Sequence, residues 1–172
     1  MIKTILFVCT GNTCRSAMAE GILKKMLEGR TKGDSKFNII SAGIYALPGM
    51  NSTYEAILAA SELGVDISQH KAQQLQEDLV KKADLILVMS HTHKDYILKK
   101  FPFAHNKVFL FKKYAQRSEF KNIQSKDEDY EIVDPLGKPI DFYRAVAIEL
   151  GTELERIIPE IEKKSNKYGG EI

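Results

Sequence analysis

The sequence predicts one α/β domain of the doubly wound kind, in which helices flank both faces of a central four-stranded parallel sheet. Short apolar segments alternate with segments of helical periodicity along the 172-residue chain. Strands that are separated by helices pair in parallel through right-handed crossovers, and the helices then cover both faces of the sheet. Neither a repeat nor a linker divides the chain. We therefore expect the domain to span residues 1–164 and residues 165–172 to form a flexible tail.

Four short apolar segments are the expected strands. The first, residues 5–8, reads Ile-Leu-Phe-Val without interruption, which is typical of a strand that is buried on both faces of a parallel sheet. The other three lie at residues 37–40, 83–89 and 108–111. A highly charged segment, 112–131, follows the last strand, and we expect it to be poorly ordered, like the tail.

Segments of helical periodicity separate and follow these strands. The expected helices are residues 17–27, 54–63, 93–100 and 140–161. Gly64 is a typical helix terminator, and Pro102 disfavours a helical conformation in the residue before it, so each ends one of these helices. Pro139 stands where the first turn of the last helix is expected to begin.

The loop after the first strand carries the residues with the clearest chemical function. Its residues are Cys9, Thr10, Gly11, Asn12, Thr13, Cys14, Arg15 and Ser16. In a parallel sheet such a loop lies at the carboxyl edge, where ligands bind, and its amides gather at a helix N-terminus that attracts anions. The sequence therefore predicts that residues 10–14 form a binding loop for phosphate, with Cys9 and Arg15 at its two ends.

Cys9 is the expected nucleophile of this site. A helix N-terminus and the nearby Arg15 favour a thiolate over a thiol, and the hydroxyl of Ser16 can stabilise that thiolate further. The planar guanidinium of Arg15 holds two phosphate oxygens and binds them more tightly as charge develops in the transition state. Asp134 is the expected proton donor for the leaving group. Taken alone, Asp134 before Pro135 indicates only a turn, and the pairing with Cys9 and Arg15 favours the catalytic role.

Composition limits the alternative functions. The 25 basic and 23 acidic residues give a net charge of +2, and the basic residues are scattered, so nucleic acid is not an expected partner. The chain starts without a signal peptide and has no apolar segment long enough to cross a bilayer, so we expect a cytoplasmic protein that does not contact membranes. Two cysteines in one loop are typical of catalysis or redox sensing rather than of a disulfide scaffold. We expect a monomer, although no sequence feature determines the oligomeric state.

Five ordered motifs resemble the low-molecular-weight protein tyrosine phosphatase family. They are the loop at residues 9–16, Ser41-Ala42-Gly43, residues 64–68, residues 83–86 and Asp134-Pro135. The resemblance covers nearly the whole chain and implies phosphorylated proteins as substrates, without a metal or a cofactor. It implies that Cys9 forms a phosphocysteine, that Arg15 and the loop amides hold the phosphate, and that Asp134 protonates the leaving group and then activates water. It also implies that Asn12 holds the unusual backbone of the loop.

Thr13 narrows the range of expected substrates. Tyrosine-directed members of the family commonly carry a bulky aliphatic residue here, whereas threonine resembles the bacterial protein-arginine phosphatases. Leu136-Gly137 also replaces the aromatic residues that often follow the Asp-Pro pair in tyrosine-directed members. We therefore favour phosphoarginine as the substrate, with phosphotyrosine as the alternative, in which case Thr13 only packs the loop. Ala17 replaces a common proline, and we expect this change to leave the enzyme active.

Cys14 has two interpretations. It is a small apolar loop residue, or it protects Cys9 reversibly by forming a disulfide, which the short separation along a curved loop favours. The two cysteines are too few for the disulfide relay of the related arsenate reductases. A non-catalytic phosphate-binding module or a thiol redox sensor also remains open, and Asp134 discriminates against both because neither needs an acid above the loop.

The histidines are expected to be structural. His91 and His93 are two positions apart, but no further cluster with ligand spacing accompanies them, so a surface pair at a helix start is favoured over a metal site. His70 and His105 are expected to be ordinary loop residues.

Overall fold

The computed structural model describes residues 2–28, 30, 37–114 and 127–165. The expectation of poor order for residues 112–131 and 165–172 is wrong where these segments are described, because residues 112–113, 127–130 and 165 lie in helices. Residues 115–126 and 166–172 of these two segments lie outside the described residues.

A four-stranded parallel sheet forms the centre of the domain. Its strands are β1 (Thr4–Cys9), β2 (Asn38–Gly43), β3 (Leu85–Val88) and β4 (Val108–Leu110). The spatial order is β2-β1-β3-β4, and every neighbouring pair is parallel, which confirms the expected sheet. The chain passes from β1 to β2 on one side and then to β3 on the other. This reversal makes the carboxyl end of β1 the topological switch point, where ligands of such sheets bind.

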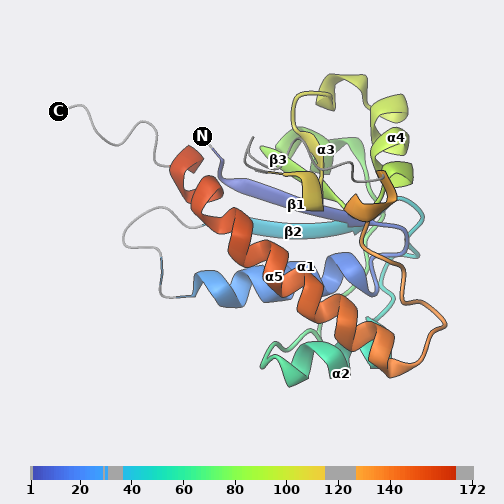
Figure 1. Ribbon diagram of the computed structural model, residues 1–172. Helices are drawn as coiled ribbons and strands as arrows, with labels where there is room; N and C mark the ends of the chain where they lie inside the picture. The colour runs from blue at the N-terminus through green and yellow to red at the C-terminus, as the bar shows by residue number, and fades with distance from the viewer. Residues whose placement is uncertain (1, 29, 31–36, 115–126, 166–172) are drawn as a thin grey trace.

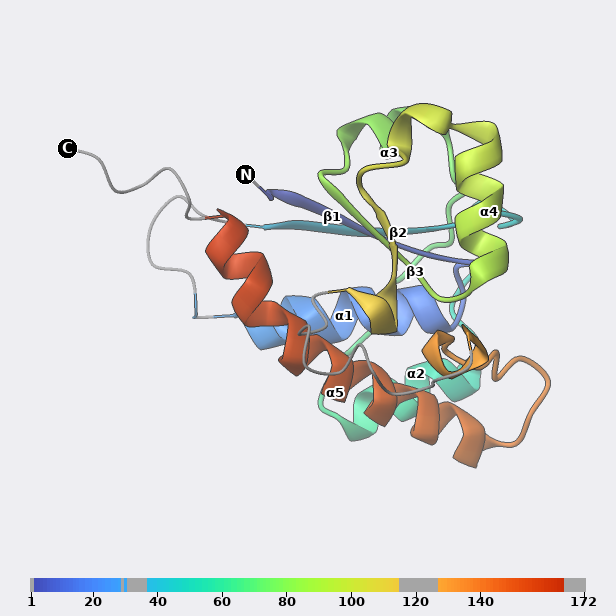
Figure 2. The same ribbon diagram turned by 45° about the horizontal axis from the view of Figure 1, so that its top comes forward.

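Helices cover both faces of the sheet. They are α1 (Arg15–Leu27), α2 (Tyr54–Glu62), α3 (Glu77–Lys82), α4 (His91–Lys100) and α5 (Ile140–Ser165). Short 3₁₀ helices lie at η1 (Pro102–Ala104), η2 (Phe111–Lys113) and η4 (Asp127–Tyr130). The long α5 crosses in front of α1 with α2 below, while α3 and α4 lie on the other side of the sheet (Figures 1 and 2). The doubly wound arrangement is therefore confirmed.

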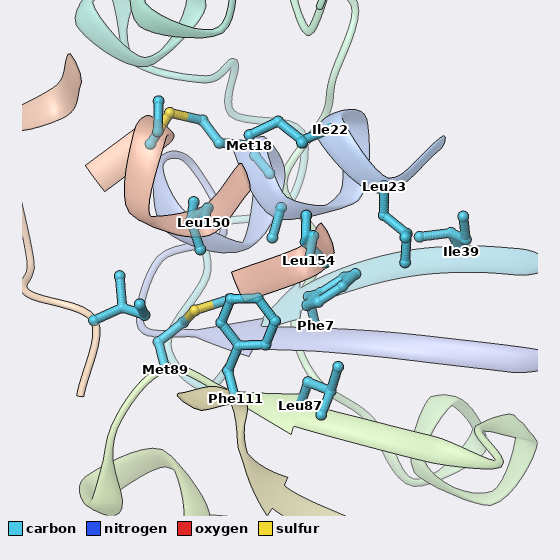
Figure 3. Packing of buried hydrophobic residues seen from close by; sticks show 14 of the residues in the cluster. Phe7, Met18, Ile22, Leu23, Ile39, Leu87, Met89, Phe111, Leu150 and Leu154 are labelled. Atoms are coloured by element: carbon cyan, nitrogen blue, oxygen red, sulfur yellow. The ribbon is translucent and has the colours of Figure 1, made fainter. Parts of the chain in front are cut away.

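Strand β1 supplies side chains to two hydrophobic cores. Successive side chains of a strand point to opposite faces, so Ile5 and Phe7 pack with α1 and α5, whereas Leu6 and Val8 pack with the cluster under α3 and α4. Figure 3 shows Phe7 beside Phe111 and Leu154 in the first core, and the two rings meet edge to face at 5.9 Å between centroids. All of β1 is buried, which fixes the position of the loop that follows it.

The element boundaries differ from the expected ones for identifiable reasons. Phe111 leaves the sheet and enters η2, because its ring packs against Phe7 in the core opposite to that of Leu110. Helix α3 was not expected; it has only six residues and one fully buried side chain, Val80, so it shows no helical periodicity. Pro159 lies inside α5 without ending it. No helix among the described residues is long and apolar enough to cross a membrane.

Candidate active site

The loop after β1 lies at the topological switch point, as the sequence predicts. It joins Cys9, the last residue of β1, to Arg15, the first residue of α1. Cys9 is in register with Gly43 of β2, and a Cβ on Gly43 would lie 2.5 Å from the carbonyl oxygen of Thr10 and 2.9 Å from the amide nitrogen of Asn12. The glycine of the Ser-Ala-Gly motif therefore leaves the space that the loop occupies.

Cys9 is almost completely buried, and hydrogen bonds surround its sulfur. Its Sγ lies 2.9 Å from the hydroxyl oxygen of Ser16, and the backbone N–H of Asn12 donates to it at 3.3 Å. Both partners belong to the loop and the first turn of α1, whose unpaired amides favour negative charge. The arrangement can stabilise a thiolate at Cys9.

Asn12 holds the centre of the loop in a left-handed conformation, with φ of 56°. Its side-chain Nδ2 donates to the hydroxyl oxygens of Ser16 at 2.9 Å and Ser41 at 2.8 Å, and its Oδ1 accepts from the backbone N–H of Gln73 at 2.9 Å. The residue is fully buried. Left-handed backbone is costly for a residue with a side chain, so these three bonds stabilise a conformation that the loop alone would not hold.

Arg15 connects the loop to a distant part of the chain. Its buried guanidinium donates from Nη1 to the carbonyl oxygen of Ile132 at 3.0 Å and from Nη2 to Oδ2 of Asp134 at 2.8 Å. Asp134 is half-exposed, and its other oxygen accepts from the backbone N–H of Leu136 at 3.1 Å. The expected nucleophile, phosphate ligand and acid are thus brought to one loop.

The second thiol of the loop is buried behind it. Cys14 and Cys9 are both free thiols, and the Sγ of Cys14 lies 3.5 Å from the hydroxyl oxygen of Thr53 and 3.6 Å from that of Thr13. Burial raises the pKa of Cys14, and the neighbouring Cys9 raises it further. Burial therefore disfavours the thiolate form of Cys14.

Two histidines contact the loop, although neither was expected to do so. His93 is buried, so the expectation of a surface pair with His91 is wrong for it, and its Nε2 lies 2.9 Å from the hydroxyl oxygen of Thr10. His70 is not an ordinary loop residue either, because its Nε2 lies 2.8 Å from the carbonyl oxygen of Asn12. Ser90 caps α4 just after β3 and so places His93 on the first turn of that helix, but this cap does not by itself indicate that the ring is buried.

The described residues contain no cluster of three or more His, Cys, Asp or Glu side chains that could hold a metal ion. The polar groups that converge on the loop are the thiol of Cys9, the guanidinium of Arg15, the carboxylate of Asp134 and the loop amides. Groups of these types can act as a nucleophile, a phosphate ligand and an acid.

A doubly wound domain with a Cys-x5-Arg loop at its switch point defines a class of cysteine-dependent phosphatases, and comparison with known proteins agrees. The family model "Low molecular weight phosphotyrosine protein phosphatase" matches residues 4–167. The chain is 35% identical over 159 residues to a protein-arginine-phosphatase from Geobacillus stearothermophilus, covering 92% of this chain and 95% of that protein. It is 46% identical over 161 residues to EpsP of Ralstonia solanacearum, a probable low molecular weight protein-tyrosine-phosphatase, covering 94% and 97%.

A solved structure gives the same result. The YwlE arginine phosphatase from Geobacillus stearothermophilus superposes with a TM-score of 0.81 at 32% identity, covering 99% of both chains. The chain therefore belongs to the low molecular weight phosphotyrosine protein phosphatase family, and it is a protein phosphatase. Both protein-arginine and protein-tyrosine phosphatases are among its relatives, so membership of the family does not by itself specify which phosphorylated side chain is the substrate.

Proposed function

We propose that this phosphatase favours phosphoarginine in proteins and acts through a phosphocysteine formed on Cys9. The observation that carries this proposal is the convergence on one loop of the Cys9 sulfur, held by Ser16 and Asn12, and of Arg15 with its distant partner Asp134. Each of the three proposed catalytic groups has a defined position there before a substrate binds.

The first step is attack of the Cys9 thiolate on phosphorus. The S–P bond forms while the P–N bond of phosphoarginine breaks, and Asp134 gives a proton to the departing guanidine nitrogen. The hydroxyl of Ser16 and the amide of Asn12 support the thiolate before the attack and as it is regenerated. In the second step Asp134 takes a proton from water, which attacks phosphorus, and the S–P bond breaks to release inorganic phosphate.

Arg15 and the loop amides bind the transferred phosphoryl group. Residues 10–14 present their backbone around the end of α1, and Arg15 is buried, so water weakens its electrostatic interaction little. The planar guanidinium of Arg15 can donate to two phosphoryl oxygens at once. Its hydrogen bond to Asp134 must break for this to happen when a substrate binds. Thr10, Gly11, Asn12, Thr13 and Cys14 are thus proposed as substrate-binding residues.

Thr13 and the residues after Pro135 support the preference for phosphoarginine. Thr13 is half-buried in the loop, and its side chain is proposed to limit the space beside the bound phosphoryl group. Leu136, exposed next to the acid, offers no ring to sandwich a phenyl group. The names of the Geobacillus relatives agree with this choice.

Phosphotyrosine is the second candidate, and one observation favours it. The backbone N–H of Tyr45 donates to the carbonyl oxygen of Thr10 at 2.9 Å, and its ring is 68% exposed beside the loop while contacting Tyr96 edge to face. An exposed aromatic ring at this edge can pack against the ring of phosphotyrosine.

We further propose that Cys14 protects Cys9 by reversible disulfide formation. Support comes from the burial of both free thiols in one short loop. The alternative, in which Cys14 only packs the loop, predicts that Cys14→Ser recovers from peroxide as fully as the parent does after treatment with a thiol reductant. A cytoplasmic location and a monomeric state are also proposals that the family and sequence favour.

The deciding experiment compares kcat/KM on peptides carrying phosphoarginine and phosphotyrosine, for the parent and for Thr13→Ile. We expect the parent to prefer phosphoarginine and Thr13→Ile to shift toward phosphotyrosine. A parent that prefers phosphotyrosine would retain the mechanism and overturn the substrate. Cys9→Ser should bind oxyanions without turnover, so persistent turnover in that variant would overturn the phosphocysteine mechanism.

A further inference from the structure

A buried histidine that the proposed reaction does not use lies against the phosphate loop. His93, on the first turn of α4, is 2% exposed and bonds through both ring nitrogens. We propose that His93 is a positioning residue that holds Thr10, and with it the first turn of the phosphate loop, through its Nε2. This inference rests on the proposed role of that loop as the phosphate site.

The contacts connect the loop to a rigid support. Nε2 of His93 lies 2.9 Å from the hydroxyl oxygen of Thr10, and Nδ1 lies 2.9 Å from the hydroxyl oxygen of Ser90. Ser90 also caps α4 by accepting from the backbone N–H of His93 at 3.4 Å. A neutral imidazole has one donor and one acceptor, and each hydroxyl can act as either, so both ring nitrogens are satisfied.

The support itself is fixed by the sheet. Met89, just before Ser90, donates its backbone N–H to the carbonyl oxygen of Val8 at 3.1 Å, one residue before Cys9. Its own carbonyl accepts from the backbone N–H of Ile132 at 2.8 Å, and Ile132 is the residue whose carbonyl holds Arg15. The start of α4 is therefore bonded both to the strand that ends in the nucleophile and to the segment that leads to the acid.

The position of Thr10 explains why this anchor matters. Thr10 directly follows Cys9, and its backbone N–H is among the amides proposed to bind phosphate. On the β2 side its carbonyl is held by Tyr45, and the middle of the loop is held by the side chain of Asn12. His93 contacts Thr10 from the side of α4. Thr10, the first residue of the phosphate loop after Cys9, is therefore held by contacts from both the β2 side and α4.

The charge state of the ring agrees with a positioning role. Burial, and then the nearby positive charge of Arg15, lower the pKa of His93 to about 4, although Asp134 acts in the opposite direction. The imidazole is therefore neutral at neutral pH. It contributes hydrogen bonds to the site and does not add a second positive charge beside Arg15.

Two isosteric substitutions separate the two ring contacts. The amide of glutamine reaches the position of Nε2, whereas that of asparagine reaches only the position of Nδ1. His93→Gln should keep the bond to Thr10 and remain within about threefold of the parent in kcat/KM. His93→Asn should keep only the bond to Ser90 and lose about 10- to 30-fold, mainly in kcat, because a loosened loop fits the transition state less well.

Three further measurements distinguish positioning from general damage. His105, which is exposed, is the matched control, and both its glutamine and asparagine variants should leave kcat/KM unchanged. Thr10→Val should cost as much as His93→Asn, and the double variant should lose no more than either alone, since both remove one interaction. Tungstate affinity, measured by calorimetry, should fall in His93→Asn and not in His93→Gln.

Equal kcat/KM in the glutamine and asparagine variants of His93, or additive losses with Thr10→Val, would overturn this inference. The tungstate titration requires no turnover, so it tests the anchor even if the phosphocysteine mechanism fails. Measurement of Cys9→Ser alongside tests that mechanism separately.

Discussion

The guanidinium of Arg15 and the carboxylate of Asp134 form an ion pair at 2.8 Å, although the residues are 119 positions apart in the chain. Arg15 is buried and Asp134 is half-exposed, so the pair connects the buried end of the loop to the protein surface. The same guanidinium is proposed to bind phosphate. In this proposal the phosphoryl group of a substrate replaces the Asp134 carboxylate as the partner of the Arg15 guanidinium. The carboxylate is then free to act on the leaving group.

Asp134→Asn should separate binding from turnover. Removing the carboxylate leaves Arg15 more available, so tungstate should bind about threefold more tightly, because a half-exposed ion pair contributes only about 0–1 kcal/mol. Turnover of an aryl phosphate with a poor leaving group should fall by about 10²- to 10⁴-fold, while an activated aryl phosphate should lose much less. Calorimetry and steady-state rates with the two substrates test this prediction. Equal losses on both substrates would contradict the acid role.

Arg15→Lys should show that geometry matters as well as charge. Lysine keeps the positive charge but loses the planar fork that binds two oxygens and contacts Ile132 and Asp134 together. We expect kcat/KM to fall by about 100- to 1,000-fold. Arg144→Lys is the control, since Arg144 forms an exposed ion pair with Glu62 between α5 and α2, and its activity should match that of the parent. An active Arg15→Lys enzyme would show that bidentate binding is unnecessary.

The sequence predicts the sheet and the loop because both are encoded locally. Continuous apolar segments define the strands, and the Cys-x5-Arg spacing lies within eight residues of the first strand. From the sequence, Asp134 was expected to lie near Cys9 and Arg15 because the reaction needs an acid, but its ion pair with Arg15 was not expected. Its geometry depends on the packing of residues 132–136, which no local pattern specifies.

His93 was missed for the opposite reason. Histidine has no strong preference for interior or surface, and its neighbours Thr92 and Lys94 are polar, so the local pattern indicates a surface pair with His91 at a helix start. Only the three-dimensional contact with Thr10, which is 83 positions away, reveals the buried ring. Long-range side-chain contacts of this kind carry no periodic signal in a single sequence.

Gly43→Ala should distort the phosphate loop, because Gly43 packs directly against the loop backbone. The new Cβ would lie 2.5 Å from the carbonyl oxygen of Thr10 and close to the amide of Asn12, both of which are backbone atoms that cannot rotate away. We expect a loss of activity of at least about tenfold and a lower melting temperature, since overpacking typically costs about 1–3 kcal/mol. Gly151→Ala in α5 is the control, because nothing lies closer than 3.9 Å and alanine favours a helix. That variant should retain its activity and melt no lower than the parent.

The neutral state of His93 should make the stability of the fold depend on pH. Its folded pKa of about 4 lies below the ordinary value of 6.5, so the unfolded chain takes up this proton at higher pH than the folded chain does. With respect to His93, the free energy of unfolding is therefore highest above about pH 6.5 and decreases as the pH falls toward 4. The separation of the two pKa values corresponds to a loss of about 3 kcal/mol by pH 4, of which about 2 kcal/mol is reached by pH 5.

Urea unfolding of the parent and of His93→Gln at pH 7 and pH 5 measures this dependence. Glutamine does not titrate, and the carboxylates that also destabilise proteins in acid are common to both chains, so the difference between them isolates His93. We expect the parent to lose about 2 kcal/mol more than the variant between the two pH values. Equal losses would mean that the imidazole is protonated as easily inside the fold as outside it. That result would contradict the burial of the ring beside Thr10.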